Sequence, residues 1–252
     1  MVSLIDERSN RDFVIAHHYA RSFPAAVLNV GLFDRGRAGA ALHPGRHVGA
    51  LVLSVPVQER VLTGVLPGLE PYRESVELGR LVLLDSVPAN AESFFIARAL
   101  RVAAEFGVVA CVAFSDPVPR RNLLTGDIVL PGHVGTVYQA SNARYLGRSS
   151  PTTKLLLPDG TILNSRSLQK VRAQERGAAG VERRLIELGA PPRPVGDDPS
   201  VWLSEALQEV GVHRFRHPGM HRYVLTTPRA RGHRGARIGL AAQTYPVRSR
   251  AT

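Results

Sequence analysis

A strand–helix–strand pattern in the first half of the chain constrains its fold most. An apolar segment, Glu77–Leu84, is followed by a short loop, a helical pattern over Ala91–Phe106 and a second apolar segment, Val108–Phe114. Asn90 can cap the start of the helix, and Gly107 stands where a helix C-terminus favours glycine. A strand, a helix and a strand this close together predict a βαβ unit with parallel strands and a right-handed crossover.

Flanking segments extend this unit into a larger sheet. Val27–Phe33 and Val48–Val57 are rich in β-branched and apolar residues, and they could pair as a hairpin. A Pro-, Gly- and Arg-rich loop is expected from Asp116 to Gly135, followed by a short helix over 137–142. The predicted fold class is therefore mixed α/β, with a central mixed sheet and helices on both faces.

Further local signals support the main helix and predict a later hairpin. Phe94, Ala97, Leu100 and Ala104 recur at helical spacing, which supports the helix. Further along, Leu155–Leu163 contains an Asp-Gly pair typical of a hairpin turn. Helices are expected from Ser165 or Ser167 onward, over 181–188 and over 201–210, and a last strand is expected over 223–226.

Charge is distributed unevenly along the chain. The chain has 252 residues and a net charge of +11, and residues 210–252 contain nine arginines and no acidic residue. Such a block attracts polyanions by counterion release, although it could also be a disordered, solubilising tail. We expect a catalytic domain over 1–192, an extension packing on it over 193–228, and a basic, disordered tail over 229–252.

Several classes of protein are disfavoured by the sequence. Cys111, the only cysteine, lies in an apolar run, so an intrachain disulfide is impossible and a buried thiol is expected. No apolar run is long enough to span a membrane, and the charged N-terminus does not resemble a signal peptide. We therefore expect a cytoplasmic protein. No Walker loop, HExxH, GxSxG or CxxC motif is present.

Residues suited to chemistry lie near the expected strand ends. Asp116 and Ser115 follow the buried strand, where open α/β sheets place functional groups, although Asp116 could instead cap a turn. His17 and His18 are consecutive, so at most one is expected to enter a site, and His18 is the better candidate. Arg80 interrupts an apolar strand, either to face polar surroundings or to bind an anion.

Four blocks of sequence resemble the phage Mom proteins. They are HHYARSFP at 17–24 with LNVGLF at 28–33, LVLLD at 81–85 leading to AFSDP at 113–117, VYQASN at 137–142, and SLQKVR at 167–172 through GAP at 189–191. HRY at 221–223 is also similar. Mom proteins are regarded as enzymes related to the GNAT acetyltransferases that convert adenine in phage DNA to an N6-carbamoylmethyl form, which protects the DNA from restriction. The resemblance implies a GNAT-like sheet and this activity here.

The resemblance also implies roles for individual residues. His18, Asp116 and Tyr138 are expected to be catalytic, and Arg80, Ser93 and Asn142 to bind the donor of the transferred group. Contacts with double-stranded DNA and its flipped adenine are expected from a wider set: His17, Tyr19, Arg21, Ser115, Lys170, Arg172 and Arg222. Tyr138 inherits its role from the tyrosine that protonates the leaving thiolate in GNAT enzymes, but it could also be a core aromatic.

The donor is left open by the sequence. The loop 85–91 lacks the Gly-rich segment with which acetyltransferases cradle a pyrophosphate, so acetyl coenzyme A and another small donor are both compatible. A metal ion is possible, because His17, His18, Asp116 and His133 could in principle assemble a site, but none is predicted.

Two alternatives to a DNA-modifying enzyme remain. One is a GNAT acyltransferase that uses acetyl coenzyme A on a protein or a small amine. The other is a non-catalytic DNA-binding phage protein, in which the arginine-rich tail carries the whole function. Binding of coenzyme A without any effect of DNA would favour the first, and loss of all activity on truncation near residue 210 would favour the second.

Overall fold

The computed structural model describes residues 1–36 and 45–247, which form two compact units. The first unit contains residues 1–116, 134–148 and the chain from 220 onward, and the second contains 117–133 and 149–219. These units do not follow the boundaries at 192 and 228 expected from the sequence. The chain leaves the first unit after Asp116 and returns to it twice, so the second unit is built from two separate segments.

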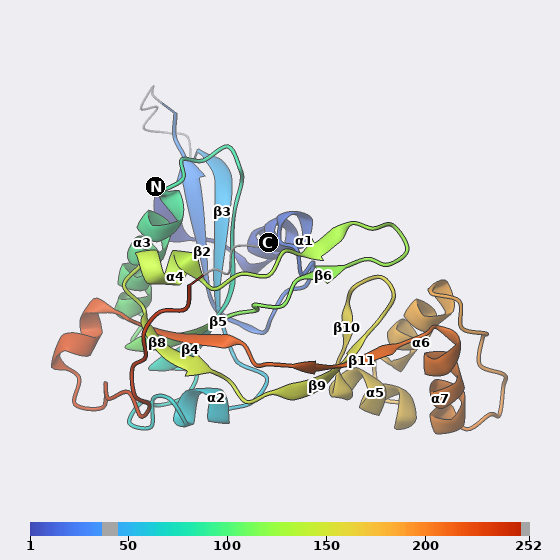
Figure 1. Cartoon of the computed structure of the whole chain (residues 1–252). Helices are drawn as coiled ribbons and strands as arrows, with labels where there is room; N and C mark the ends of the chain where they lie inside the picture. Colours follow the sequence, from blue (N-terminus) through green and yellow to red (C-terminus); the bar gives the residue numbers. More distant parts are fainter. Residues whose placement is uncertain (37–44, 248–252) are drawn as a thin grey trace. The chain divides into compact units, whose positions relative to one another are not determined.

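The first unit is built on a seven-stranded sheet in the order β1-β2-β3-β4-β5-β12-β8 (Figure 1). Only β4 and β5 run parallel, as the βαβ pattern predicts, and the other neighbours are antiparallel. The strands are β1 Val2–Leu4, β2 Ala26–Asp34, β3 Arg46–Ser54, β4 Ser75–Leu83, β5 Ala110–Ser115, β8 Arg144–Arg148 and β12 His221–Thr226. β12 was expected in a C-terminal extension, yet it lies inside the main sheet.

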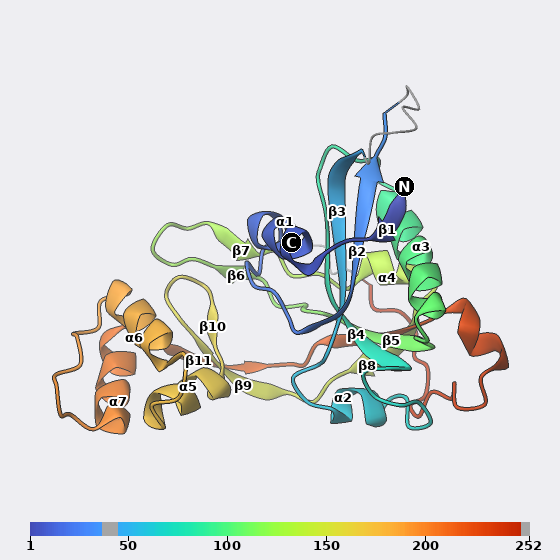
Figure 2. The ribbon, with the colours of Figure 1, turned by 180° about the vertical axis from the view of Figure 1, so that it is seen from behind.

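Helices cover both faces of this sheet, which confirms the predicted fold class (Figure 2). α1 (Glu7–His17) packs Val14 against Ala50 and Val52 of β3, and α2 (Arg60–Thr63) contributes to an apolar cluster with β5 and β12. On the opposite face, α3 (Ala91–Glu105) packs against the alternate β3 residues Leu51 and Leu53, and α4 (Thr136–Ala140) adds to the same cluster.

The buried residues of α3 include only part of the apolar stripe seen in the sequence. Phe95, Ile96, Ala99, Leu100 and Ala103 are buried, whereas Phe94 is 47% exposed and Ala97 is also exposed. Both faces of the helix carry apolar residues at helical spacing, so periodicity alone could not choose between them. Gly107 follows α3 with a φ of +92°, as expected, whereas Asn90 stands at the N-cap position but makes no side-chain capping hydrogen bond, contrary to expectation.

β4 and β5 pair over only part of their lengths. Their ladder joins Ser75–Leu78 to Ala110–Ala113 and then stops, while β4 continues along β3 to Leu83 and β5 continues along β12. The register between β3 and β4 shifts next to Gly79. A Cβ at Gly79 would lie 2.2 Å from Ser54 Oγ, so only glycine fits this close approach. The two central strands therefore part beyond Leu78.

The arginine-rich tail is ordered up to residue 247, contrary to expectation. A 3₁₀ helix, Pro228–Gly232, is followed by a segment whose Ala236 and Ile238 pack against the cluster under α2. A Cβ at Gly235 would lie 2.1 Å from the carbonyl oxygen of Gly68, so the two backbones touch. Small and apolar residues between the arginines thus let the segment pack. Residues 248–252 lie outside the described part.

The second unit contains a three-stranded sheet, β10-β9-β11, packed against three helices. Its elements are β9 Thr152–Leu156, β10 Ile162–Leu163, α5 Ser165–Arg172, α6 Ala178–Glu187, α7 Pro199–Glu209 and β11 His213–His217. Trp202 and Leu203 of α7 are buried in its core. The expected hairpin at Asp159-Gly160 is present between β9 and β10.

A further hairpin stands where the sequence indicated only a loop. β6 (Arg120–Arg121) pairs with β7 (Ile128–Leu130) in an antiparallel ladder within the second unit (Figure 1). Six residues, 122–127, join the two strands. The Asn, Thr, Gly and Asp residues among them are typical of a turn. The flanking strands are too short to be recognised by alternation of apolar and polar residues.

The structure also describes the environment of Cys111 and the lengths of the helices, which bear on the disulfide and membrane classes considered in the sequence. Cys111 is fully buried, and burial raises the pKa of its thiol to about 12, so it is a small apolar residue in this core. Over residues 1–36 and 45–247, no helix has the length and apolar character needed to cross a membrane.

Candidate active site

Glu77 lies in β4 at the point where β4 and β5 part. Its neighbours Val76 and Leu78 belong to the core beneath α3, so Glu77 faces the α1 side of the sheet. Within the described residues, no hydrogen bond or ion pair engages its carboxylate. Burial raises the pKa of Glu77 to about 7, and the nearby charge of Arg80 partly opposes this rise. Both protonation states are therefore populated near neutral pH, as a proton acceptor requires.

Arg80 fixes the chain that follows α1 against β4. Its guanidinium donates to the carbonyl oxygen of Ser22 at 3.0 Å, to Ser22 Oγ at 2.9 Å and to the carbonyl oxygen of Gly79 at 2.6 Å. Burial lowers its pKa, while Tyr19, Glu77 and Tyr138 act in the opposite direction. These contacts favour a positioning role for Arg80; direct contact with a donor stays a prediction.

His18 and Tyr19 follow the end of α1. His18 is only 8% exposed, and its Nδ1 accepts a hydrogen bond from the backbone N–H of Ala20 at 3.0 Å. In the neutral ring the proton is consequently on Nε2. The rings of His18 and Tyr19 lie 4.2 Å apart, and Tyr19 is 48% exposed. A buried imidazole beside an exposed phenol is thus held next to the strand that carries Glu77 and Arg80.

His17 has different surroundings from His18. It is exposed, and its ring lies 4.6 Å from that of Phe13, which in turn contacts the ring of His47 at 4.1 Å. The two histidines therefore differ in burial and in partners, and His17 packs into an aromatic group that includes Phe33 of β2.

Tyr138 joins the same electrostatic group from α4. It is 6% exposed and packs on Tyr223 of β12, with the ring centroids 5.3 Å apart. Burial raises its pKa, and the charges of Tyr19 and Glu77 act in the same direction. The phenol stays protonated at neutral pH, so it can donate a hydrogen bond but cannot act as a base.

Ser115 and Asp116 end β5 and are both buried. Ser115 Oγ has no hydrogen-bond partner within the described residues. A Cβ at Gly135, which precedes α4, would lie 2.9 Å from Ser115 Oγ and 3.0 Å from the Tyr138 ring, so the hydroxyl lies beside Tyr138. Asp116 follows directly after the end of the strand.

A groove of about 1000 Å³ runs along α3 in the first unit. Its walls are the exposed face of α3, the end of α4 and the start of the 3₁₀ helix. Ser93 and Asn142, both predicted to bind the donor, line it together with Arg101 and Arg231. Hydroxyl, amide and guanidinium groups along an open groove suit a polar, negatively charged small molecule.

The remaining predicted residues are dispersed. Arg21 is exposed and has a φ of +42°, and Arg222 of β12 donates to the carbonyl oxygen of Arg148 at 3.3 Å. Lys170 and Arg172 are on α5 of the second unit. Tyr19, Arg80 and Tyr138 thus affect one another electrostatically, Ser93 and Asn142 line one groove, and the basic residues lie on different segments.

Glu77 is the candidate that sequence reasoning missed. The available signal was a carboxylate between valine and leucine in a central strand, where an ionised group is costly unless it is paired.

Histidines and acids are spread through the described part of the chain rather than clustered. Over residues 1–36 and 45–247, no three His, Cys, Asp or Glu side chains gather closely enough to hold a metal ion.

Comparison with known proteins gives one family and distant structural neighbours, two of which are described here. The model of the Mom protein family matches residues 1–247. A crystal structure assigned to a phosphinothricin N-acetyltransferase has a TM-score of 0.36 and 11% identity, covering 62% of this chain and 85% of its own. A tandem GNAT protein from clavulanic acid biosynthesis, solved without acetyl coenzyme A, has a TM-score of 0.35 and 13% identity, covering 94% and 81%. No curated protein matches the chain.

Proposed function

The chain belongs to the Mom protein family, and from this membership we propose that it is a transferase that modifies the N6 amine of adenine in phage DNA, protecting that DNA from restriction in the host cytoplasm. The transferred group is of the carbamoylmethyl type. The observation that carries the proposal is the family match over residues 1–247, and the group formed by Tyr19, Glu77, Arg80 and Tyr138 supports it with a place for the chemistry.

The proposed chemistry starts from the weakness of the adenine amine as a nucleophile. Its nitrogen lone pair is delocalised into the ring, so the proton must be removed as the new carbon–nitrogen bond forms. Glu77, with a pKa of about 7, is the proposed acceptor, and the buried His18 and Asp116 are the further candidates predicted from the sequence. The donor's leaving group departs with the bonding electrons, and the Tyr138 phenol donates a hydrogen bond to it.

The groove along α3 is the proposed donor site. Ser93 and Asn142 would bind polar atoms of the donor, and Arg101 and Arg231 would pair with its negative charge. These groups fit a small anionic donor that carries the carbamoylmethyl group; acetyl coenzyme A would fit the same groups but would transfer an acetyl group instead. The loop before α3 supplies no glycine-rich turn for a pyrophosphate, so the guanidinium groups would have to bind the anion instead.

Contacts with double-stranded DNA are proposed for residues around this group and in the second unit. Tyr19, half exposed beside His18, would stack on the flipped adenine, and the buried Ser115 Oγ would bind its edge. The phosphates would be bound by four basic residues, Arg21, Lys170, Arg172 and Arg222. His17 would make a further polar contact with the DNA.

Mass spectrometry of nucleosides tests the proposal. Plasmid DNA from cells that express the protein would be digested and compared with DNA from cells that express Asp116→Ala or Glu77→Gln. Asp12→Ala is the matched control, because Asp12 is an exposed acid on α1. A heavier deoxyadenosine is expected with the natural protein and the control but not with the two site variants. Unmodified DNA together with saturable binding of coenzyme A would instead support an acyltransferase of other amines.

A further inference from the structure

The hairpin β6–β7 presents an apolar tip. Leu123 is 70% exposed and Leu124 is 67% exposed at the loop, and Ile128 at the start of β7 is 57% exposed. Single exposed apolar residues are common on protein surfaces, but three of them lie on this one short hairpin. Such an apolar tip indicates a surface that enters a partner.

Hydrogen bonds within the second unit hold the backbone of the tip. Asn122 Oδ1 accepts hydrogen bonds from the backbone N–H groups of Leu124 at 2.8 Å and Thr125 at 3.3 Å. The N–H of Leu123 donates to the carbonyl oxygen of Pro158 at 2.7 Å, which anchors the loop to the β9–β10 turn. The polar groups are therefore satisfied within the second unit and the leucine side chains remain outside. Little conformational entropy would be lost when this tip binds.

The base of the hairpin is positively charged. Arg120 and Arg121 form β6, and the Arg121 guanidinium donates to the carbonyl oxygen of Gly126 at 3.2 Å, which holds it beside the loop. Asp127, the acid of the hairpin, accepts a hydrogen bond from Thr125 Oγ1 at 2.7 Å. An apolar tip beside arginine fits a double helix, where bases are apolar on their faces and phosphates are negative.

Two short segments of chain join this hairpin to the first unit. Three residues separate Asp116 from β6, and three separate β7 from Val134. A Cβ at Gly132 would lie 2.8 Å from the carbonyl oxygen of Pro117, so the two legs of the hairpin are in contact at its base.

We propose that Leu123 and Leu124 are a wedge that enters the base stack of double-stranded DNA, while Arg121 binds a neighbouring phosphate. This inference rests on the proposed DNA modification and names the element that extrudes the target base. Removing a base from the stack leaves a gap and loses stacking energy. Leucine side chains in that gap replace part of the lost contact, as apolar wedges do in proteins that kink DNA.

Permanganate oxidation measures extrusion of the base, and it does so without the donor of the transferred group. A thymine that loses its partner adenine becomes reactive to permanganate, so reactivity on plasmid DNA reports extrusion. The test variant is Leu123→Ala/Leu124→Ala, and the matched control is Val195→Ala, a fully exposed apolar residue in the same unit. We expect the natural protein and the control to raise thymine reactivity, and the double variant to lower it about tenfold at equal DNA occupancy.

A comparison of single-stranded with duplex DNA distinguishes a role in base extrusion from other roles of the two leucines. With a small-molecule cell extract as donor source, the double variant should modify single-stranded circular DNA as well as the natural protein does, but modify the duplex about tenfold more slowly. Equal loss on both forms, or unchanged duplex reactivity, would overturn the wedge. Unchanged reactivity with loss of self-association in sedimentation would assign the tip to a protein contact. If the natural protein neither binds nor modifies DNA, the proposed function itself fails.

Discussion

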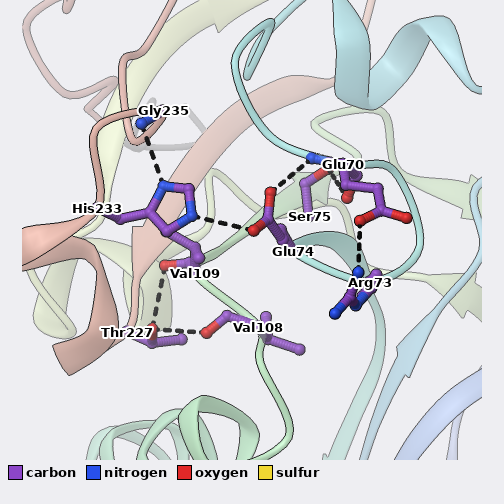
Figure 3. Close-up of polar contacts among 9 residues, drawn as sticks. All are labelled: Glu70, Arg73, Glu74, Ser75, Val108, Val109, Thr227, His233 and Gly235. Atoms are coloured by element: carbon purple, nitrogen blue, oxygen red, sulfur yellow. Dashed lines mark hydrogen bonds and ion pairs between the residues drawn. The ribbon is translucent and has the colours of Figure 1, made fainter.

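Glu74 and Glu77 are three residues apart in the sequence but have opposite environments. Glu74, just before β4, accepts a hydrogen bond from the backbone N–H of Glu70 at 2.9 Å and pairs with His233 Nε2 at 3.0 Å (Figure 3). These partners lower its pKa. Glu77, inside the strand, has no such partner within the described residues, and burial raises its pKa to about 7.

The difference separates a structural carboxylate from a chemical one. Glu74 is stabilised in its charged form, so it joins the C-terminal segment to the sheet and holds no proton at neutral pH. Glu77 gains little from being charged, and its proton can leave or return near pH 7. A substitution of Glu77 should therefore change mainly the rate of DNA modification, and a substitution of Glu74 should change mainly the stability of the fold.

The largest effect is expected when Glu77 is replaced by Gln. Glutamine keeps the size and polarity of the side chain but cannot take up the adenine proton, so modification should fall by about 10²–10⁴-fold. The rate of formation of the modified deoxyadenosine measures this. Glu105→Gln, an exposed acid at the end of α3, is the matched control. A loss below threefold would remove Glu77 from the chemistry and leave His18 or Asp116 as the acceptor.

The pH dependence sharpens the same assignment. Because Glu77 accepts a proton only when it is ionised, the rate should rise as pH increases through about 7. The charge of Arg80 lowers the pKa of Glu77, so Arg80→Gln should move the midpoint of this rise to higher pH. A pH–rate profile at saturating DNA measures both midpoints. The same midpoint in both proteins would mean that another group controls the profile.

Replacing Tyr138 by Phe should have a smaller effect on the rate. The phenol stays protonated, so its loss removes one hydrogen bond to the leaving group and slows modification about 10–100-fold. The ring and its packing on Tyr223 remain, so stability should change by less than about 1 kcal/mol. Single-turnover rates and thermal unfolding measure the two quantities. A large fall in unfolding temperature with little loss of rate would make Tyr138 a core aromatic.

The buried carboxylate should also lower stability at high pH. The folded-state pKa of Glu77 is raised above its unfolded value of 4.5, so folding is opposed increasingly as pH rises from 4.5 through about 7. Glu77→Gln removes this effect. The variant should match the natural protein near pH 4 and exceed it by about 2 kcal/mol near pH 8. Denaturant unfolding at both pH values measures the free energies, and a variant that is less stable at pH 8 would contradict the assignment.

The apolar parts of the fold could be predicted from the sequence because they carry their own signal. β2–β5 and α3 are runs of apolar residues with capping and turn residues at their ends, and the parallel pairing of β4 and β5 follows from the βαβ pattern. β11, with the sequence His-Arg-Phe-Arg-His, has no such signal. Its strand conformation depends on pairing with β9, which is distant in the sequence.

The candidate site could be predicted only in part, for a related reason. His18, Asp116 and Tyr138 belong to recognisable blocks, whereas Glu77 becomes unusual only through burial and the absence of a partner. The ordered tail was missed because its arginines dominated the composition. Its packing depends on a few small residues, and Gly235 against Gly68 is a contact that no local pattern reveals.

The smallest effect is expected at Glu74. Its lowered pKa means that its contribution to stability is present above its unfolded value of 4.5 and is lost as pH falls below that value. Because the pair with His233 is partly exposed, Glu74→Gln should lower stability at neutral pH by only about 0.2–1 kcal/mol. Modification of DNA should be unchanged. Urea unfolding at pH 7 and pH 3.5 measures the effect, which should be smaller at the lower pH. If Glu74→Gln instead abolished modification while leaving stability intact, the division between a structural and a chemical carboxylate would be wrong.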